Sequence, residues 1–541
     1  MPDTPSYRSQ VLDHLGLVAG MFDELGIGDV IDQATQQNPE MRIVTVGNAV
    51  KAMILNGLGF VNQQLYLVPM FFHNKPTHRL LAPEIDAHHL NDDTLGRALE
   101  TLYEYGVTEL YSLIAATAAR RLGLTPTFVH LDRTSFHVDG RYNSGEEPDA
   151  HVIHITRGYS RDHRPDLNQV MLDLMVEHQA GIPLLMQPLS GNTSDASDFG
   201  QVVSQHLQHL HLTYGTTYLV ADSALYSEEN LQKLADTGSK WITRVPATLT
   251  AAQVALAQVD PAAMAPLTEG YRYHVLETTY GGVVQRWLLM YSEHRRPQAQ
   301  RTVDQHLLRQ GTNDLKAFKK LCRTGFACEA DAQQALAAFA HGLHATALAE
   351  VAIRVLPRYR MRGRPSHGAQ PDQLVYQIEG ALASSLATRE ALVVQQSCFI
   401  LATNELDDNQ LSPQQVLEGY KGQKHAERGF RFLKDPQFLA SSLYLKKPER
   451  IMALLMVMTV CLLVYAALEY RIRKGLKDHE ATFPDQKGKR IQNPTARWVF
   501  HYFVGIHLLL IPGQWPIVLN LTAEQQHLLQ LLGDRYAWFY R

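Results

Sequence analysis

Cysteine is scarce in this chain, and its few copies are not arranged to bind a metal. Four occur in 541 residues, and no two of them follow the C-x-x-C spacing. This pattern indicates neither a zinc site nor a disulfide framework, so a reducing cytoplasm is the expected compartment. The first residues, MPDTPSYRSQ, also lack the basic-then-apolar order of a signal peptide.

An excess of charge of either sign is also lacking, because the formal net charge is -4. The charges are nevertheless unevenly distributed along the chain. Residues 1–120 contain 7 Lys and Arg against 14 Asp and Glu, whereas residues 420–500 contain 16 against 7. A polyanionic substrate would therefore bind the later part of the chain.

Only one long uncharged apolar run stands out, IMALLMVMTVCLLVYAAL, from Ile451 to Leu468. Its length is about the minimum for a membrane span. Thr459, Cys461 and Tyr465 dilute the run, and no second run pairs with it. We therefore expect a helix buried inside a large domain, and a membrane-associated protein is the alternative.

The periodicity of apolar residues changes along the chain, which at 541 residues is too long for one core. Up to about residue 120 the spacing is three and four residues, which predicts helices. From Thr127 on, three β-type runs are followed by alternating helix-type and strand-type segments, the order of an RNase H-like α/β sheet. The predicted parts are a helical N-terminal domain for DNA-end binding or dimerisation (1–120), a mixed-sheet core (121–245), an inserted β-rich and helical domain (246–396), the second part of the core (397–480) and a helical C-terminal region (481–541).

Three acidic residues lie on elements that such a sheet brings together. Asp132 is expected near the end of the first strand, in TFVHLDRTSF, and Asp222 at the end of the fourth, in TTYLVADSALYS. These two strands are neighbours in an RNase H-like sheet. Glu427 follows on a predicted helix, YKGQKHAERGFRFLK, where cations surround it. Each acid alone would be interpreted as a turn, cap or surface ion-pair residue. Together, in this order, they predict a catalytic site.

Three converging carboxylates predict a metal-dependent phosphodiester chemistry. Without a cation they would repel one another, and some would be protonated. Two Mg²⁺ ions about 4 Å apart would use that charge to activate a nucleophile and to neutralise the attacking and leaving oxygens. Asp132 is expected to bridge both ions, with Asp222 and Glu427 each completing one coordination shell. Mn²⁺ is expected to substitute.

The helix around Glu427 resembles the signature of one group of bacterial insertion-sequence DDE transposases. That signature is Tyr, two residues, Arg, three residues, Glu, six residues, Lys. Tyr420, Glu427 and Lys434 match it, whereas Gln423 stands at the Arg position. The segments GYSRDHRPDLNQV, LSGNTSD and NPTARWVFHYFVGI fit the resemblance too. It implies an RNase H-like core with a β-rich insertion, Mg²⁺, and a dimer acting on transposon ends.

Further residues are candidates for DNA contact. Trp287 lies in the predicted insertion, where an aromatic residue of hairpin-forming transposases stacks on a flipped base, although a strand Trp more often belongs to a core. Four arginines alternate in PRYRMRGRPSHG, whose centre resembles a minor-groove AT-hook, with a solvated loop as the alternative. No metal-binding pattern links His130, His137, His151 and His154. The remaining candidates for DNA contact are Tyr420, Gln423, Lys421, Lys424, Arg431, Lys434, Arg157, Arg161, His163, Arg164, Arg358, Arg360, Arg362 and Arg364.

The predicted function is therefore that of a metal-dependent transposase. It would hydrolyse a strand at each element end and use the freed 3′ hydroxyl to attack target DNA, with double-stranded DNA and a second copy of the chain as partners. The alternative from another class is a catalytically silent, transposase-derived DNA-binding protein. The presence of all three acids disfavours that alternative.

Overall fold

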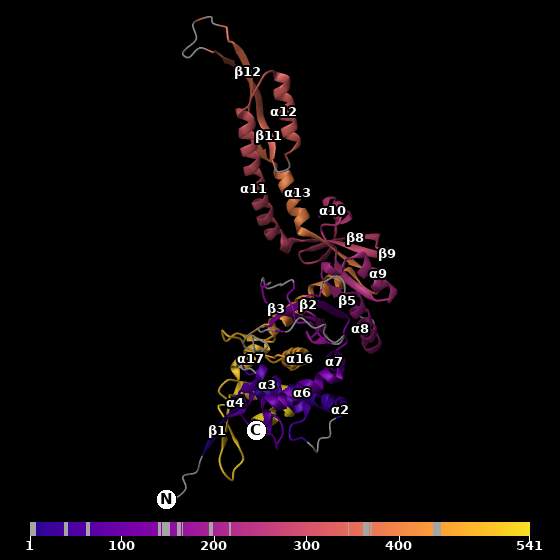
Figure 1. The fold of residues 1–541 in the computed structure, drawn as a ribbon, viewed down its shortest axis with the longest axis vertical. Coiled ribbons are helices and arrows are strands. Elements are labelled where there is room, and N and C mark those ends of the chain that lie inside the picture. The colour runs from indigo at the N-terminus through magenta and orange to yellow at the C-terminus, as the bar shows by residue number, and fades with distance from the viewer. Residues whose placement is uncertain are drawn as a thin grey trace.

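The structure is a computed structural model that describes residues 7–36, 42–60, 65–138, 142, 152–158, 164, 166–193, 199–215, 218–343, 346–360, 367, 370–435 and 445–541, without the side chains of 199–205 and 425–426. Figure 1 shows three tiers, with a helical base built from the N-terminal and C-terminal regions, a sheet in the middle and a long arm above it.

A nine-stranded sheet forms the middle tier, in the order β4-β3-β2-β5-β6-β13-β9-β8-β7. β2 pairs antiparallel with β3 and parallel with β5, and β6 continues parallel to β5. This arrangement confirms the predicted α/β, RNase H-like core. The strands are β2 (Phe128–Val138), β3 (Asn168–Glu177), β4 (Pro183–Leu189), β5 (Tyr218–Ala221), β6 (Lys240–Arg244), β7 (Ala265–Thr268), β8 (Tyr271–Tyr280), β9 (Val283–Ser292) and β13 (Cys398–Thr403).

The sheet is buried on both faces by helices. Because strand side chains alternate between faces, residues paired in register point to the same side. The first face, which we call face A, carries Phe128, Tyr218 and Ile242, and residues of α14 pack on it. The opposite face, face B, carries Leu219 and Trp241. The helices near the sheet are α8 (Phe199–Tyr214), α9 (Glu228–Asp236), α10 (Thr250–Ala257), α14 (Pro413–Lys421) and α15 (Lys424–Leu433).

The sheet is wider than the sequence predicted. β7, β8 and β9 lie within the predicted insertion at 246–396, yet they extend the sheet beyond β13. The pairing of β13 with β9 explains why β9, VVQRWLLMYS, is buried almost throughout. Nothing in the local sequence shows this pairing, because more than a hundred residues separate the two strands.

The segment that leaves the sheet is the arm, residues 296–397. Its helix α11 packs against α13 and β12, and a three-stranded sheet in the order β10-β12-β11 completes it. Figure 1 shows the arm rising from β9 and returning to the sheet through α13. The elements are α11 (Arg296–Arg323), β10 (Gly325–Phe326), α12 (Glu329–His341), β11 (Thr346–Arg358), β12 (Gln373–Ser384) and α13 (Leu386–Ser397).

The two ends of the chain form one base rather than two separate parts. β1 (Arg8–Val11) pairs with β16 (His507–Leu510), so the N-terminal region is helical except for this strand. Both ends pack on α16 and share its core. The other elements are α1 (Leu15–Leu25), α2 (Ile27–Ala34), α3 (Val46–Gly57), α4 (Val68–Phe72), α5 (Thr77–Leu80), α6 (Asp92–Tyr105), α7 (Val107–Leu122), α16 (Pro448–Asp478), β14 (Phe483–Pro484), β15 (Arg490–Ile491), α17 (Ala496–Tyr502), β17 (Ile517–Leu519), α18 (Ala523–Leu532) and α19 (Asp534–Ala537).

The apolar run at Ile451–Leu468 lies in α16. Within the described residues, α16 is the one helix long and apolar enough to cross a membrane by length and composition. Its most apolar 18-residue window is 89% buried inside the protein, against α1, α3, α6 and α7. The run therefore forms a core helix, which favours the expected buried helix over the membrane span.

Candidate active site

Asp132 and Asp222 lie at the same level of two neighbouring strands. β2 and β5 run parallel with His130 opposite Val220, so two residues further along each chain Asp132 stands opposite Asp222. Paired strands lie about 4.8 Å apart. Both carboxylates belong to face A, where β5 ends at Ala221. The sheet thus brings together two of the three predicted acids.

The position of Asp132 differs from the prediction in one respect. The residue lies in the middle of β2, because pairing with β3 continues to Val138. The parallel partner β5 stops earlier, and this leaves the half-buried Asp132 beside the end of a strand. The side chain of Arg133 points to face B and pairs with Asp173 of β3.

Asp222 is held by the turn that follows β5. Its Oδ1 accepts a hydrogen bond from the backbone N–H of Ala224, which caps a short 3-10 helix, Ser223–Leu225. The Thr243 hydroxyl donates to the Asp222 carbonyl over 2.7 Å. These bonds fix the backbone and leave the second carboxylate oxygen of this exposed residue for a ligand.

Two glycines allow α14 and the following turn to approach β2 closely. A Cβ on Gly419 would lie 2.9 Å from the Phe128 ring, and one on Gly422 would lie 2.7 Å from His130 Nε2. No side chain fits at either position, since real Cβ contacts are longer. The spacing in EGYKGQ therefore serves a close crossing over face A.

This crossing brings the segment that carries Glu427 alongside the part of β2 that contains Asp132. Gly422 lies beside His130, and twelve residues later Lys434 Nζ lies 6.0 Å from the ring centroid of Phe136, six residues along β2. Twelve residues of mostly helical chain and six of strand cover about 18 and 20 Å, respectively. Glu427 shares the helix face of Lys434, because seven residues are nearly two turns. The third acid therefore lies on the exposed edge of α15 beside β2.

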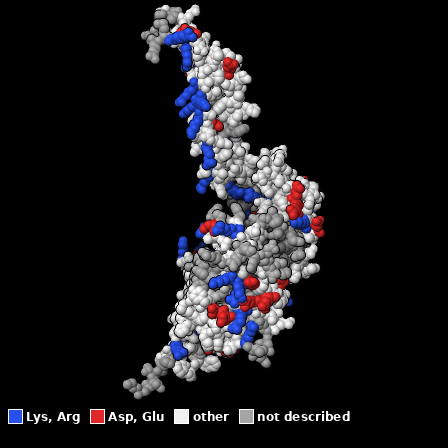
Figure 2. Space-filling model, viewed as in Figure 1, with Lys and Arg blue, Asp and Glu red and all other residues white. Residues whose placement is uncertain are grey.

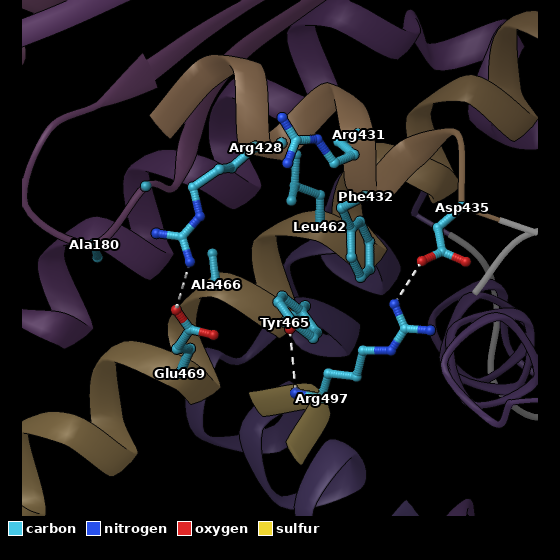
Figure 3. A pocket seen from close by; sticks show the side chains of 12 residues that line it. Ala180, Arg428, Arg431, Phe432, Asp435, Leu462, Tyr465, Ala466, Glu469 and Arg497 are labelled. Atoms are coloured by element: carbon cyan, nitrogen blue, oxygen red, sulfur yellow. Dashed lines mark hydrogen bonds and ion pairs between the residues drawn. The ribbon is translucent and has the colours of Figure 1, made fainter. Parts of the chain in front are cut away.

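Another side of α15 is anchored to the base (Figure 3). It lines a pocket of about 200 Å³ between α15 and α16. Arg428 lies 3.8 Å from Glu469, and Arg497 lies 2.8 Å from Asp435. The Arg497 backbone N–H donates to the Tyr465 hydroxyl. Arg497 comes from the NPTARW segment noted in the sequence, so this motif holds the helix that carries Glu427.

A basic and aromatic group lies beside Asp222, and sequence reasoning missed part of it. Arg244 of β6 is in register with Asp222, one residue beyond the pair Ala221–Thr243. The guanidiniums of Arg244 and Arg295 lie 5.9 and 5.3 Å from the Phe399 ring centroid, and the ring centroids of Phe399 and Tyr420 are 6.4 Å apart. Arg244 could have been found from the sequence, because it is a basic residue at the end of β6, the strand that follows Asp222 along the chain. None pointed to Arg295, which comes from the arm base.

The Tyr420 hydroxyl stays protonated in this group. Burial raises its pKa, the nearby Arg244 opposes the shift and Asp222 adds to it. Burial lowers the pKa of Arg295, and Arg244 beside it contributes. An arginine remains charged at neutral pH in spite of such a shift, so both groups can donate hydrogen bonds to a phosphate next to Asp222. Lys421 follows Tyr420 in α14 and adds a further cation, and its Nζ lies 3.8 Å from the Tyr271 ring centroid.

The other predicted DNA contacts are scattered. Gln423 precedes α15, Lys424 is exposed on its first turn, and Arg431 lines the pocket of Figure 3. Arg157 is exposed beside the start of β3, where Thr156 bridges to Gln169.

The remaining basic residues predicted to contact DNA are exposed or lie outside the described residues. Arg164 is exposed and pairs with Asp166. Arg358 ends β11 and Arg360 follows it, both exposed at the far end of the arm. Arg161, His163, His151, Arg362 and Arg364 lie outside the described residues.

Trp287 is not brought to the acids. It lies on face B, is 3% exposed, and its Nε1 donates to the Tyr226 hydroxyl over 3.0 Å. Asp222 is on face A, so the sheet itself separates the two side chains. This placement favours the core alternative over stacking on a flipped base.

Trp287→Ala is expected to reduce the free energy of unfolding by about 3–5 kcal/mol, because it empties a filled core position. Trp287→Phe should keep the affinity of the folded protein for DNA unchanged. Urea unfolding and fluorescence anisotropy measure the two effects. Trp515→Ala is the matched control, since that side chain is 90% exposed and its loss should change stability little. Loss of DNA affinity in a fully folded Trp287→Phe protein would restore the stacking role.

The donor set of this site suits a hard divalent cation. Asp132, Asp222 and Glu427 offer carboxylate oxygens, which Mg²⁺ prefers, and two of the three are exposed to incoming ligands. Clustered carboxylates without a cation would repel one another. The residues present therefore fit a divalent metal beside a phosphate-binding group.

The comparisons with known proteins agree with this chemistry. Residues 124–464 match a family described as "Transposase DDE domain", and residues 7–116 match one described as "Domain of unknown function (DUF4277)". No curated protein shows significant sequence similarity to the chain. A cryo-EM structure of the piggyBac transposase synaptic complex with hairpin DNA aligns with a TM-score of 0.36 and 10% identity, covering 92% of this chain and 82% of that one. This likeness is too low to support an inference.

Proposed function

Because the chain belongs to the family of transposases with a DDE domain, we propose that it is the Mg²⁺-dependent transposase of a bacterial insertion sequence. It cleaves DNA at the element ends and joins the freed 3′ hydroxyl to target DNA. The observation that carries this proposal is that Asp132 and Asp222 stand opposite each other on face A, with the helix of Glu427 crossing beside β2.

The residues of the site have two different roles, holding the metal and binding the phosphate. Asp132 and Asp222 come from the rigid sheet, so their separation is fixed before substrate arrives. Glu427 comes from a helix anchored through Asp435 and through Glu469 of α16. A phosphate held next to Asp222 would accept hydrogen bonds from Tyr420, Arg244 and Arg295, and the two arginines would also offset its negative charge.

Asp132, Asp222 and Glu427 would hold a divalent metal, which would neutralise charge on the phosphodiester oxygens and lower the pKa of a water or hydroxyl. The protein then needs no histidine as a general base. His130, two residues before Asp132, is fully buried under Gly422. It supports the crossing of the chain over β2 instead.

The proposed setting is that of an element-encoded bacterial enzyme. Its substrates are double-stranded element ends and target DNA, its location is the cytoplasm, and it acts as a homodimer when two ends are held together. Lys434 matches the last position of the Tyr-Arg-Glu-Lys signature, and Lys421 or Lys424 takes over the contact that Gln423 cannot make.

Purified protein is expected to nick a supercoiled plasmid that carries the element ends when Mg²⁺ or Mn²⁺ is present, and not when EDTA has removed the metal. Agarose gels of nicked, linear and joined products measure this. A plasmid without the ends is the control for specificity. Binding to the end DNA without any nicking in either metal would favour the catalytically silent DNA-binding protein.

A further inference from the structure

The outer face of α11 is a continuous basic surface. Successive residues of an α-helix are rotated by about 100° around its axis, so the direction of each side chain of α11 follows from its position in the sequence. Six cations fall within an arc of about 100° by that rule. All six are exposed. We call this surface the α11 ridge, made of Arg301, Arg309, Lys316, Lys319, Lys320 and Arg323.

Acidic residues are absent from the ridge. The other residues in the same arc are neutral, Gln298, Thr302, Gln305 and Thr312. The two acids of α11 lie off the arc and are already engaged. Asp304 pairs with Arg389 of α13, and Asp314 accepts a hydrogen bond from Thr346.

The opposite face of α11 explains why the ridge faces solvent. Ala299, Val303 and Phe318 are buried there against α13 and the arm sheet. The ridge therefore has a fixed orientation on the arm. Within the part of the chain that the structure describes, none of its six cations forms an ion pair.

The length and position of the ridge match those of a DNA duplex that extends from the acids along the arm. From Arg301 to Arg323 the helix rises about 33 Å, close to one turn of B-DNA, about 34 Å. Arg295, directly before α11, belongs to the group beside Asp222. Figure 2 shows Lys and Arg following one edge of the arm down to its concave junction with the body.

We propose that the α11 ridge binds the phosphate backbone of duplex DNA about one helical turn away from the cleaved bond. This proposal rests on the proposed function, which brings duplex DNA to the foot of the arm. Contacts to phosphates carry no sequence information, so the ridge holds and orients the duplex and another region reads the ends.

The test uses the full chain with Lys316, Lys319 and Lys320 replaced by Gln. Glutamine keeps most of the side-chain length and the helix propensity, and the replaced residues are exposed. The control replaces two exposed cations that lie outside the ridge and outside residues 420–500, Arg354 and Arg535, by Gln. Fluorescence anisotropy measures affinity for a short and a long duplex that share the same end sequence, at several salt concentrations. Circular dichroism verifies that each variant is folded.

The ridge variant is expected to lose the affinity that the long duplex adds over the short one, and the salt dependence for the long duplex should fall by about one unit per lost contact. The control variant should behave like the unaltered chain. Equal affinities and salt slopes for ridge variant and unaltered chain would overturn the proposal, as would equal losses on both duplexes. If the unaltered chain nicks end DNA and the ridge variant retains the long-duplex affinity, only the ridge proposal fails. If the unaltered chain neither binds nor nicks DNA, the proposed function fails.

Discussion

Asp132→Asn is expected to reduce nicking of element-end DNA by on the order of 10²–10³-fold or more, as removal of one group that stabilises transition-state charge does. Asparagine keeps the size of the side chain but removes the negative charge that a divalent metal requires. Asp132 stands opposite Asp222 on the neighbouring strand, and α15, which carries Glu427, packs beside β2, the strand of Asp132. Product formation in single-turnover gels measures the loss.

DNA binding should persist in the same variant, since Asp132 contributes a metal ligand and not a phosphate contact. Asp236→Asn is the matched control, an exposed carboxylate at the end of α9 whose change should leave the rate unaltered. Glu427→Gln should resemble Asp132→Asn. Nicking by Asp132→Asn at the normal rate would remove this residue from the site, and loss of binding equal to the loss of cleavage would assign it a DNA contact.

Asp173→Ala is expected to reduce the free energy of unfolding by about 3–5 kcal/mol, because it leaves a buried charge without its partner. Arg133 and Asp173 form two hydrogen bonds of 2.6 and 2.8 Å between neighbouring strands. Both side chains are only 7% exposed. Arg133 follows Asp132 directly, so the pair also fixes the strand that carries the first acid. Urea unfolding followed by circular dichroism measures the change.

The exposed pair Arg164–Asp166 provides the matched control for this prediction. Its side chains are 54% and 60% exposed, and Asp166→Ala should change the free energy of unfolding little. Replacing both Arg133 and Asp173 by apolar residues should recover much of the stability, since no buried charge then lacks a partner. An Asp173→Ala protein as stable as the control variant would show that the pair contributes little.

Local patterns in the sequence were sufficient to propose the core of the site. Asp132 and Asp222 each follow a short apolar run, and strand order alone makes those runs neighbours. The Glu427 helix was recognisable from its spacing to Tyr420 and Lys434. Their assignment rests on the strand order expected for the fold and on the spacing within one helix.

Features that depend on distant pairing could not be predicted. β9 joins the sheet because β13 pairs with it across the whole arm, and Trp287 is consequently a core residue on face B. Arg295 approaches Tyr420 only because the arm begins beside β13. The N- and C-terminal regions share a core because β1 pairs with β16, which no pattern within either segment indicates.

The arm departs from and returns to neighbouring strand ends, since Tyr291 of β9 faces Cys398 of β13. Because the arm begins and ends at paired strand ends, its length does not determine how β9 and β13 align. Its length can change at small entropic cost, because closing a longer loop adds only about 0.6 kcal/mol per doubling. Evolution can therefore lengthen, trim or exchange this appendage while the machinery for breaking DNA stays as it is.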